Sequence, residues 1–220
     1  VVMGPLIRGL ALALWGAVLL SSSLSGRLEL LLRGVFHPLV TVAGVLLLAL
    51  GVHQMLRRPS GGWKRSWLLA GAVAVLVLLI PPNPSFSDLA SNRSSDLGAE
   101  LELDFQLPPG QRSLTDWVRL LRSQPDPQLY AGDPVRISGF VLPQPGDRPQ
   151  LGRLLVRCCL ADATPIGLPV RWPAGYQPQP DQWLAIDGRM GVETHRGIPR
   201  SVVLVNSLRP IPRPARPLEP

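Results

Sequence analysis

Apolar stretches in the first third of the chain constrain its fold most strongly. Each of the first two is about as long as the ~20 residues that a helix needs to cross the ~30 Å hydrocarbon layer of a bilayer. The first contains one charged residue, Arg8, and the second contains no Lys, Arg, Asp or Glu. The sequence therefore predicts a membrane region over residues 1–82, with spans at residues 5–24, 35–55 and 66–82.

The third stretch is the shortest, and its flanks support its assignment as a span. Trp63, Lys64, Arg65 and Trp67 form an interfacial anchor at its start, and a proline-rich segment ends it. A buried helix of a soluble domain is the alternative, which would leave two spans. For the first stretch the alternative is a cleavable signal peptide, because small residues follow its apolar core. The remaining apolar stretches predict a membrane protein in either case.

The positive charge of the chain lies almost entirely beside these apolar stretches. Residues 1–82 carry seven basic residues and one acidic residue, whereas residues 83–220 carry 15 basic and 14 acidic residues. A nucleic-acid-binding protein needs a basic face on a folded domain, and the second part has no such excess. The sequence therefore predicts a lipid bilayer, and no nucleic acid, as a partner.

Loop charges predict the orientation in the membrane. The loop at residues 57–65 has four basic residues and no acidic residue, whereas the loop after the first span has Arg27, Glu29 and Arg33. Basic loops tend to stay in the cytoplasm. With three spans in a bacterial cell membrane, everything after residue 82 then lies outside the cytoplasm. Two spans would reverse the side.

The outer part is predicted to begin with a linker and one helix. Residues 83–112 are rich in Ser, Asn, Asp, Gly and Pro, although Leu101, Leu103 and Phe105 alternate as in a short strand. Apolar residues then recur every three to four positions, which is typical of an amphipathic helix. Ser113 is the candidate N-cap of this helix, with an acidic residue, Asp116, at the capping-box position.

Short β-patterned segments follow this helix, and turns separate them. Gly139 interrupts the first segment, as expected at a bulge or a tight barrel bend. The pattern predicts an all-β domain over residues 113–209, an OB-like five-stranded barrel with one preceding helix; a β-sandwich is the alternative. The proline-rich tail, residues 210–220, is predicted to be extended or disordered. The expected strands are residues 135–142, 153–160, 168–172, 183–190 and 201–208.

Three sequence blocks occur in this outer part, at residues 130–141 (YAGDPVRISGFV), 153–163 (RLLVRCCLADA) and 181–188 (DQWLAIDG). Together with the hydrophobic N-terminal region, they make the chain similar to the YcgQ-like family of permease subunits. The resemblance implies an integral membrane protein with a non-membrane C-terminal domain that accompanies a larger multi-span permease. Its motif residues in this sequence are Gly139, Phe140, Val141, Arg153, Ala161, Ala163, Asp181, Trp183 and Gly188.

Cys158, Cys159 and Asp162 form the sharpest local motif. Thiolates and carboxylates bind soft or divalent metal ions, and His195 is a further candidate ligand. Thiol redox chemistry is a second interpretation. The third is structural: on a strand, neighbouring side chains point to opposite faces, so Cys158 would fill the barrel core while Cys159 faces a partner or a loop. The sequence has no C-x-x-C pair, which is common in zinc sites.

No catalytic motif accompanies these residues, and the sequence predicts that the chain is not an enzyme. It shows no Ser with a paired His, no glycine-rich phosphate loop and no clustered carboxylates at an acid–base spacing. His37 and His53 lie near the two ends of the second span, where an interfacial role is expected.

Two functional hypotheses follow from the sequence. The leading one is an accessory subunit of a larger multi-span permease, with an extracytoplasmic barrel that binds substrate or partner. The alternative is a self-standing envelope protein whose β domain binds a soft metal or acts in thiol redox chemistry.

Overall fold

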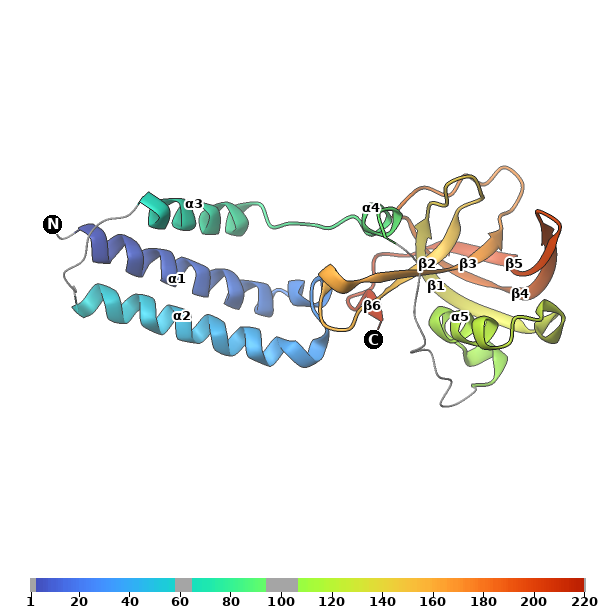
Figure 1. The fold of residues 1–220 in the computed structure, drawn as a ribbon, viewed down its shortest axis with the longest axis horizontal. Coiled ribbons are helices and arrows are strands. Elements are labelled where there is room, and N and C mark those ends of the chain that lie inside the picture. The colour runs from blue at the N-terminus through green and yellow to red at the C-terminus, as the bar shows by residue number, and fades with distance from the viewer. Residues whose placement is uncertain (1–2, 58–64, 94–106, 220) are drawn as a thin grey trace. The chain divides into compact units, whose positions relative to one another are not determined.

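The chain folds into two compact units in a computed structural model that describes residues 3–57, 65–93 and 107–219 (Figure 1). One unit is Val1–Pro84 together with Cys158–Leu160, and the other is Ser85–Arg157 together with Ala161–Pro220. The predicted anchor residues Trp63 and Lys64, and the alternating residues 101–105, lie outside the described residues.

Helices make up the first unit: α1 (Met3–Leu24), α2 (His37–Arg57) and α3 (Arg65–Leu79), with short 3₁₀ turns at Arg27–Leu30 and Gly34–Phe36 between the first two. By length and composition, Leu6–Leu24 and Gly34–Arg57 can each cross a membrane. The third helix has 15 residues, fewer than the ~20 that span the hydrocarbon layer. The structure therefore provides two candidate spans, and the third span stays a prediction.

Glycines bring α1 and α2 into close contact. A Cβ atom on Gly16 would lie 2.7 Å from the backbone N of Leu48 and 2.8 Å from the carbonyl oxygen of Gly44. A Cβ atom on Gly51 would lie 2.7 Å from the backbone N of Ala13. Small residues at such a seam are typical of packed membrane helices, because they let two backbones approach.

Within its described residues, the second unit has two α-helices and six strands. Ser113 caps the second of these helices, and its capping box with Asp116 is present as predicted. This helix packs against β1, β2 and β3, and its apolar face joins the barrel core. The elements are α4 (Phe86–Ser91), α5 (Leu114–Ser123), β1 (Pro134–Leu142), β2 (Gln150–Leu155), β3 (Thr164–Arg171), β4 (Trp183–His195), β5 (Ile198–Pro210) and β6 (Leu218–Glu219).

The five longer strands close into a barrel, which confirms the predicted architecture of a barrel preceded by a helix. Their hydrogen-bonded order is β1-β4-β5-β3-β2, and an additional antiparallel pairing of β1 with β2 closes the ring. The pairing of β3 with β5 is parallel, while the other pairings within the ring are antiparallel. This connectivity fits an OB-like barrel.

Two glycines of the sequence blocks lie where another strand's backbone comes very close. A Cβ atom on Gly139 would collide with the carbonyl oxygen of Gly152 on β2. A Cβ atom on Gly188 would collide with the carbonyl oxygen of Leu204, at the register shift between β4 and β5. Both positions need a residue without a side chain because another strand's backbone occupies the space.

Two details of the predicted strands are wrong. A strand over residues 153–160 was expected, yet β2 ends at Leu155 because the chain turns there into a loop and a 3₁₀ turn, Leu160–Asp162. The tail is also not wholly irregular. Residues Leu218–Glu219 return to the barrel and pair with β2 as the parallel strand β6.

The start of the predicted linker contains α4, whose aromatic residue joins the barrel. Phe86 is buried and packs edge-on against Phe140 and Trp183, with ring centroids 5.7 and 6.1 Å away. Trp117 and Trp183 are buried core residues, while Trp172 is half-buried and stacks on Tyr176. These tryptophans are packing residues of the barrel and do not form a ligand cage.

Candidate metal site in the loop after β2

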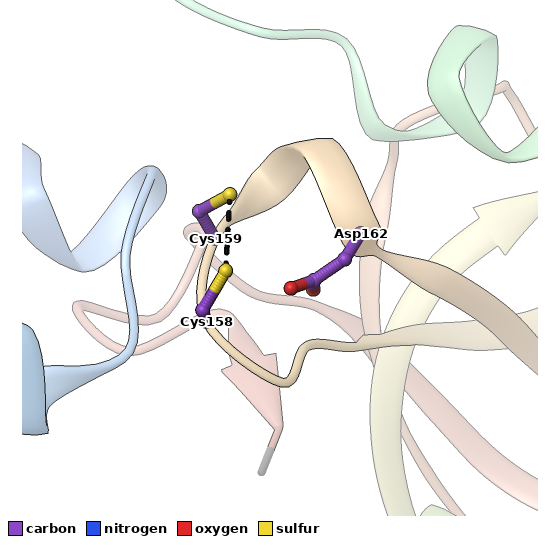
Figure 2. A group of neighbouring side chains, drawn as sticks. All are labelled: Cys158, Cys159 and Asp162. Carbon is purple, nitrogen blue, oxygen red and sulfur yellow. Dashed lines mark hydrogen bonds between the residues drawn. The ribbon is translucent and has the colours of Figure 1, made fainter.

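A short loop between β2 and β3 carries the two cysteines. The chain leaves β2 after Leu155, passes through turn residues at 157–159 and enters the 3₁₀ turn Leu160–Asp162 before β3 begins. Because these residues are not in a strand, their side chains need not alternate between opposite faces. Figure 2 shows the side chains of Cys158, Cys159 and Asp162 converging on one side of this loop.

The three side chains are close enough to share one ion. The Cys158 thiol lies 3.5 Å from the Cys159 sulfur, and one ligand atom from each of Cys158, Cys159 and Asp162 lies within 4.8 Å of the others. Cys158 is exposed and Cys159 is half-buried, so an ion in solution can reach both sulfurs. Among the described residues, these three form the cluster of His, Cys, Asp and Glu side chains that can hold a metal.

Asp162 also shapes the loop. Its Oδ1 atom accepts a hydrogen bond of 2.9 Å from the backbone N–H of Arg157, across the turn that contains both cysteines. This bond closes a ring of backbone around the thiols and keeps the carboxylate on their side of the loop. One carboxylate oxygen, Oδ1, thus holds the backbone of the loop.

One tetrahedral ion can bind both sulfurs. Two thiolates bound to one tetrahedral ion through bonds of ~2.3 Å lie about 3.8 Å apart. The two sulfurs are in hydrogen-bond contact at 3.5 Å, so a small movement of the side chains would let both bind such an ion. Two thiolates and one carboxylate are also a ligand set that Zn²⁺ accepts, and they leave one coordination position for water or a further ligand.

The structure contradicts the placement of Cys158 in the structural interpretation of the cysteines. That interpretation required Cys158 to fill the barrel core from a strand, but Cys158 is exposed in a loop. Leu154 and Ala163, on either side of the loop, are the buried residues instead. His195 is not a member of the cluster; it lies at the end of β4, where its Nε2 atom is 3.6 Å from Oδ2 of Asp147.

Backbone contacts fix residues 158–160 within the first unit. The N–H of Leu160 donates to the carbonyl oxygen of Leu31 at 2.7 Å, and the N–H of Arg33 donates to that of Cys158 at 3.0 Å. Leu32 and Cys159 form an isolated antiparallel β-bridge between these bonds. These bonds hold the backbone of residues 158–160 beside residues 31–33 of the same unit.

Most of the remaining residues singled out in the three sequence blocks serve the barrel itself. Phe140 and Val141 are fully buried, and Ala163 is also in the interior. Ala161 is exposed on the β2–β3 loop that carries the two cysteines (the thiol loop). Asp181 has a left-handed backbone (φ 62°). Its Oδ1 atom accepts a 2.6 Å hydrogen bond from the N–H of Ser87 in the first turn of α4. Phe140 and Val141 lie in β1, and Asp181 precedes β4.

Arg153 is a motif residue with an unusual environment. Its guanidinium is buried. The Nε atom donates to the carbonyl oxygen of Ser138 and the Nη2 atom donates to the Ser138 hydroxyl, each at 2.8 Å. The guanidinium carbon lies 4.9 Å from the centroid of the Trp183 ring. Burial lowers the pKa of Arg153, and the nearby Glu219 carboxylate opposes this shift. Sequence reasoning missed this pair, because its members are far apart in the chain.

A second charged cluster, also missed from sequence, joins the β1–β2 turn to the β4–β5 hairpin. Arg200 donates to Oδ2 of Asp147 at 2.7 Å and to Oε1 of Glu193 at 2.8 Å. The hydrogen bond from Arg200 lowers the pKa of Asp147 to about 2, and it raises the pKa of Arg200 itself. The two carboxylates already have cationic partners, so this cluster ties the loops together and offers no metal site.

One family model matches the part of the chain that contains the barrel. Residues 111–218 match the family model described as the DUF1980 C-terminal domain. The matched segment runs from just before α5 into β6 and therefore includes the thiol loop. No curated protein and no solved structure matches the chain significantly.

Proposed function

We propose that this protein binds Zn²⁺ through the loop after β2 and presents it from a membrane-anchored barrel. The observation that carries the proposal is the convergence of Cys158, Cys159 and Asp162 at a sulfur separation suited to a tetrahedral ion. Thiolates bind only in the deprotonated form, so binding would release protons and strengthen with rising pH. The reaction class is binding and transfer of an ion, with no covalent chemistry.

We further propose that the protein acts as an accessory subunit of a larger multi-span permease. The sequences of α1, α2 and α3 contain no Asp or Glu, and their basic residues are Arg8, Arg57 and Arg65. Polar and ionisable groups usually line ion paths within membranes. These helices alone offer no carboxylate along a path for a cation, which supports a role beside a partner that supplies one.

The metal proposal is tested by titrating the full-length chain, purified in mild detergent, with Zn²⁺. One ion per chain is expected, with loss of binding in the Cys158→Ser/Cys159→Ser double variant. Asp162→Asn is expected to weaken binding while leaving Oδ1 able to accept from Arg157. His195→Ala is the matched control, since His195 lies in the other cluster.

Absence of stoichiometric zinc in the wild-type chain would overturn the metal proposal. A Cys158–Cys159 disulfide that forms and breaks reversibly in a chain that takes up no zinc would instead favour thiol redox chemistry. Tight Cu(I) binding with weak Zn²⁺ binding would also count against the tetrahedral site.

The predicted orientation is tested with reporters fused after Pro220. If three helices span the membrane, alkaline phosphatase is active and a green fluorescent protein is dim. The reverse result would place the barrel in the cytoplasm and reduce the number of spans to two. Affinity purification from membranes tests the partner: recovery of a multi-span protein supports the accessory role, and a lone chain contradicts it.

A further inference from the structure

The edge of β2 beside the thiol loop is completed by the end of the chain. Strand β1 pairs with β2 only at Gln150, Leu151 and Gly152, so the backbone groups beyond them on that edge need another partner. Strand β6 supplies it, pairing Leu218 with Leu154 and Glu219 with Leu155. The last bond of this ladder runs from the N–H of Val156 to the carbonyl oxygen of Glu219, at 2.9 Å.

Glu219 also makes side-chain contacts beneath this ladder. Its Oε1 atom lies 3.6 Å from Nε of Arg153, and its Oε2 atom accepts a 3.3 Å hydrogen bond from the hydroxyl of Thr115 on α5. Arg153 is 8% exposed and Thr115 is 3% exposed, so this carboxylate reaches into the barrel wall. A buried guanidinium without a counter-charge is strongly unfavourable, which means that the pair holds β6 in place.

We infer that Glu219 is a positioning residue for the metal-binding loop, through its pairing with Arg153 and the bond it makes to Val156. Val156 is two residues before Cys158, so β6 fixes the point at which the chain leaves the barrel and enters the loop. The Asp162 bond to Arg157 begins at the next residue and fixes the other side. The inference rests on the proposed zinc site.

The expected consequence is a change in metal affinity without any change in the ligands. Glu219→Gln keeps the size of the side chain and its ability to bond Thr115, but leaves the Arg153 charge uncompensated. Residues that support metal ligands from outside the coordination shell typically change affinity by about 10–100-fold when mutated. We expect a loss of zinc affinity in that range for Glu219→Gln.

Three variants of the full-length chain in detergent test the inference. Zinc titration is combined with hydrogen exchange of a peptide that covers residues 156–160, in Glu219→Gln, in Arg153→Gln/Glu219→Gln and in Glu193→Gln. The single Glu219 variant should lose affinity and exchange faster in this peptide. The double variant removes the unpaired charge and should recover most of both. Glu193→Gln, which removes a carboxylate paired with Arg200, should match the wild type.

Hydrogen exchange tests the positioning role of Glu219, and zinc titration of the wild-type chain tests the proposed zinc site. Equal affinity losses in Glu219→Gln and Glu193→Gln would overturn the positioning role, because the effect would then be general. Unchanged exchange at residues 156–160 in Glu219→Gln would also overturn it, whether or not zinc binds. If the wild-type chain binds no zinc, the proposed function fails. Faster exchange in Glu219→Gln would then show only that Glu219 holds residues 156–160 in place.

Discussion

The helical unit and the barrel treat the same apolar residue types in opposite ways. Among the described residues, the exposed large apolar side chains lie between Leu6 and Ile80, except for Leu129 and Ile198. Leu46 on α2 is 57% exposed, whereas Leu184 on β4 is fully buried. Soluble proteins rarely expose contiguous apolar surface of this kind. The contrast separates a barrel with a buried apolar core from helices that expose apolar surface, two of which are long and apolar enough to cross a membrane.

The charged residues follow the same division. In the barrel, Asp147, Glu193 and Arg200 join loops through short ion pairs, and Arg153 is buried with Glu219 nearby. The helices α1 to α3 contain no acidic residue. Apolar burial and ion pairs therefore stabilise the barrel, whereas close backbone packing joins α1 and α2.

A matched pair of leucine truncations should give the largest difference between the units. Leu184→Ala is expected to lower the free energy of unfolding of the barrel by about 2–5 kcal/mol, because it opens a cavity in the core. Leu46→Ala, on a surface that faces lipid or detergent, should cost less than about 1 kcal/mol. Denaturant unfolding in detergent, followed by tryptophan fluorescence, measures both. Equal losses in the two variants would contradict the contrast between the buried apolar core of the barrel and the exposed apolar surface of the helices.

A glycine substitution tests the packing of the helices. Gly16→Ala places a Cβ atom against the backbone of α2 and should cost about 1–3 kcal/mol through overpacking. Gly71→Ala on α3 is the matched control, because its Cβ atom would lie 3.8 Å from Leu14, an ordinary contact. The thermal stability of the detergent-solubilised chain should fall only for the first variant; an equal fall in both would contradict a close seam between α1 and α2.

The Asp147 ion pair predicts a smaller, pH-dependent effect in the barrel. The folded pKa of about 2 lies below the ordinary value of 3.8, so the paired carboxylate stabilises the fold above pH ~4 and this contribution is lost as the pH falls towards 2. Asp147→Asn should cost about 1–2 kcal/mol at pH 7 and almost nothing near pH 2.

An exposed ion pair provides the control for this effect. Arg136 and Asp187 form a pair in which both side chains are more than half exposed, and Asp187→Asn should change the stability by less than about 0.5 kcal/mol at any pH. Denaturation midpoints between pH 2 and 7 compare the two variants. A pH dependence that is the same in Asp147→Asn and wild type would rule out Asp147 as its source.

Local patterns in the sequence predicted much of this fold. Ser113 and Asp116 are three residues apart and cap α5 as their spacing predicts. A glycine in mid-strand often marks a place where another backbone comes close, and the carbonyl oxygen of Gly152 lies close to Gly139. The apolar stretches predicted spans by length alone, and α3 falls short by the same criterion.

Contacts between distant segments were beyond such reasoning. The end of β2 depends on a loop that closes through Asp162 and on a tail strand that arrives more than 60 residues later in the sequence. The alternation of residues 153–160 contains neither fact, so the cysteines were expected in a strand, on opposite faces. The sequence named Cys158, Cys159 and Asp162 as candidate ligands, and the loop brings both sulfurs to the same side.

X-ray absorption spectroscopy at the zinc edge, on the zinc-loaded full-length chain, tests the central claim most directly. The account predicts a four-coordinate ion with two sulfur neighbours at ~2.3 Å and two lighter neighbours near ~2.0 Å. The sulfur shell should disappear in the Cys158→Ser/Cys159→Ser variant. A shell made only of nitrogen and oxygen in the wild-type chain would contradict the assignment of this loop as the zinc site.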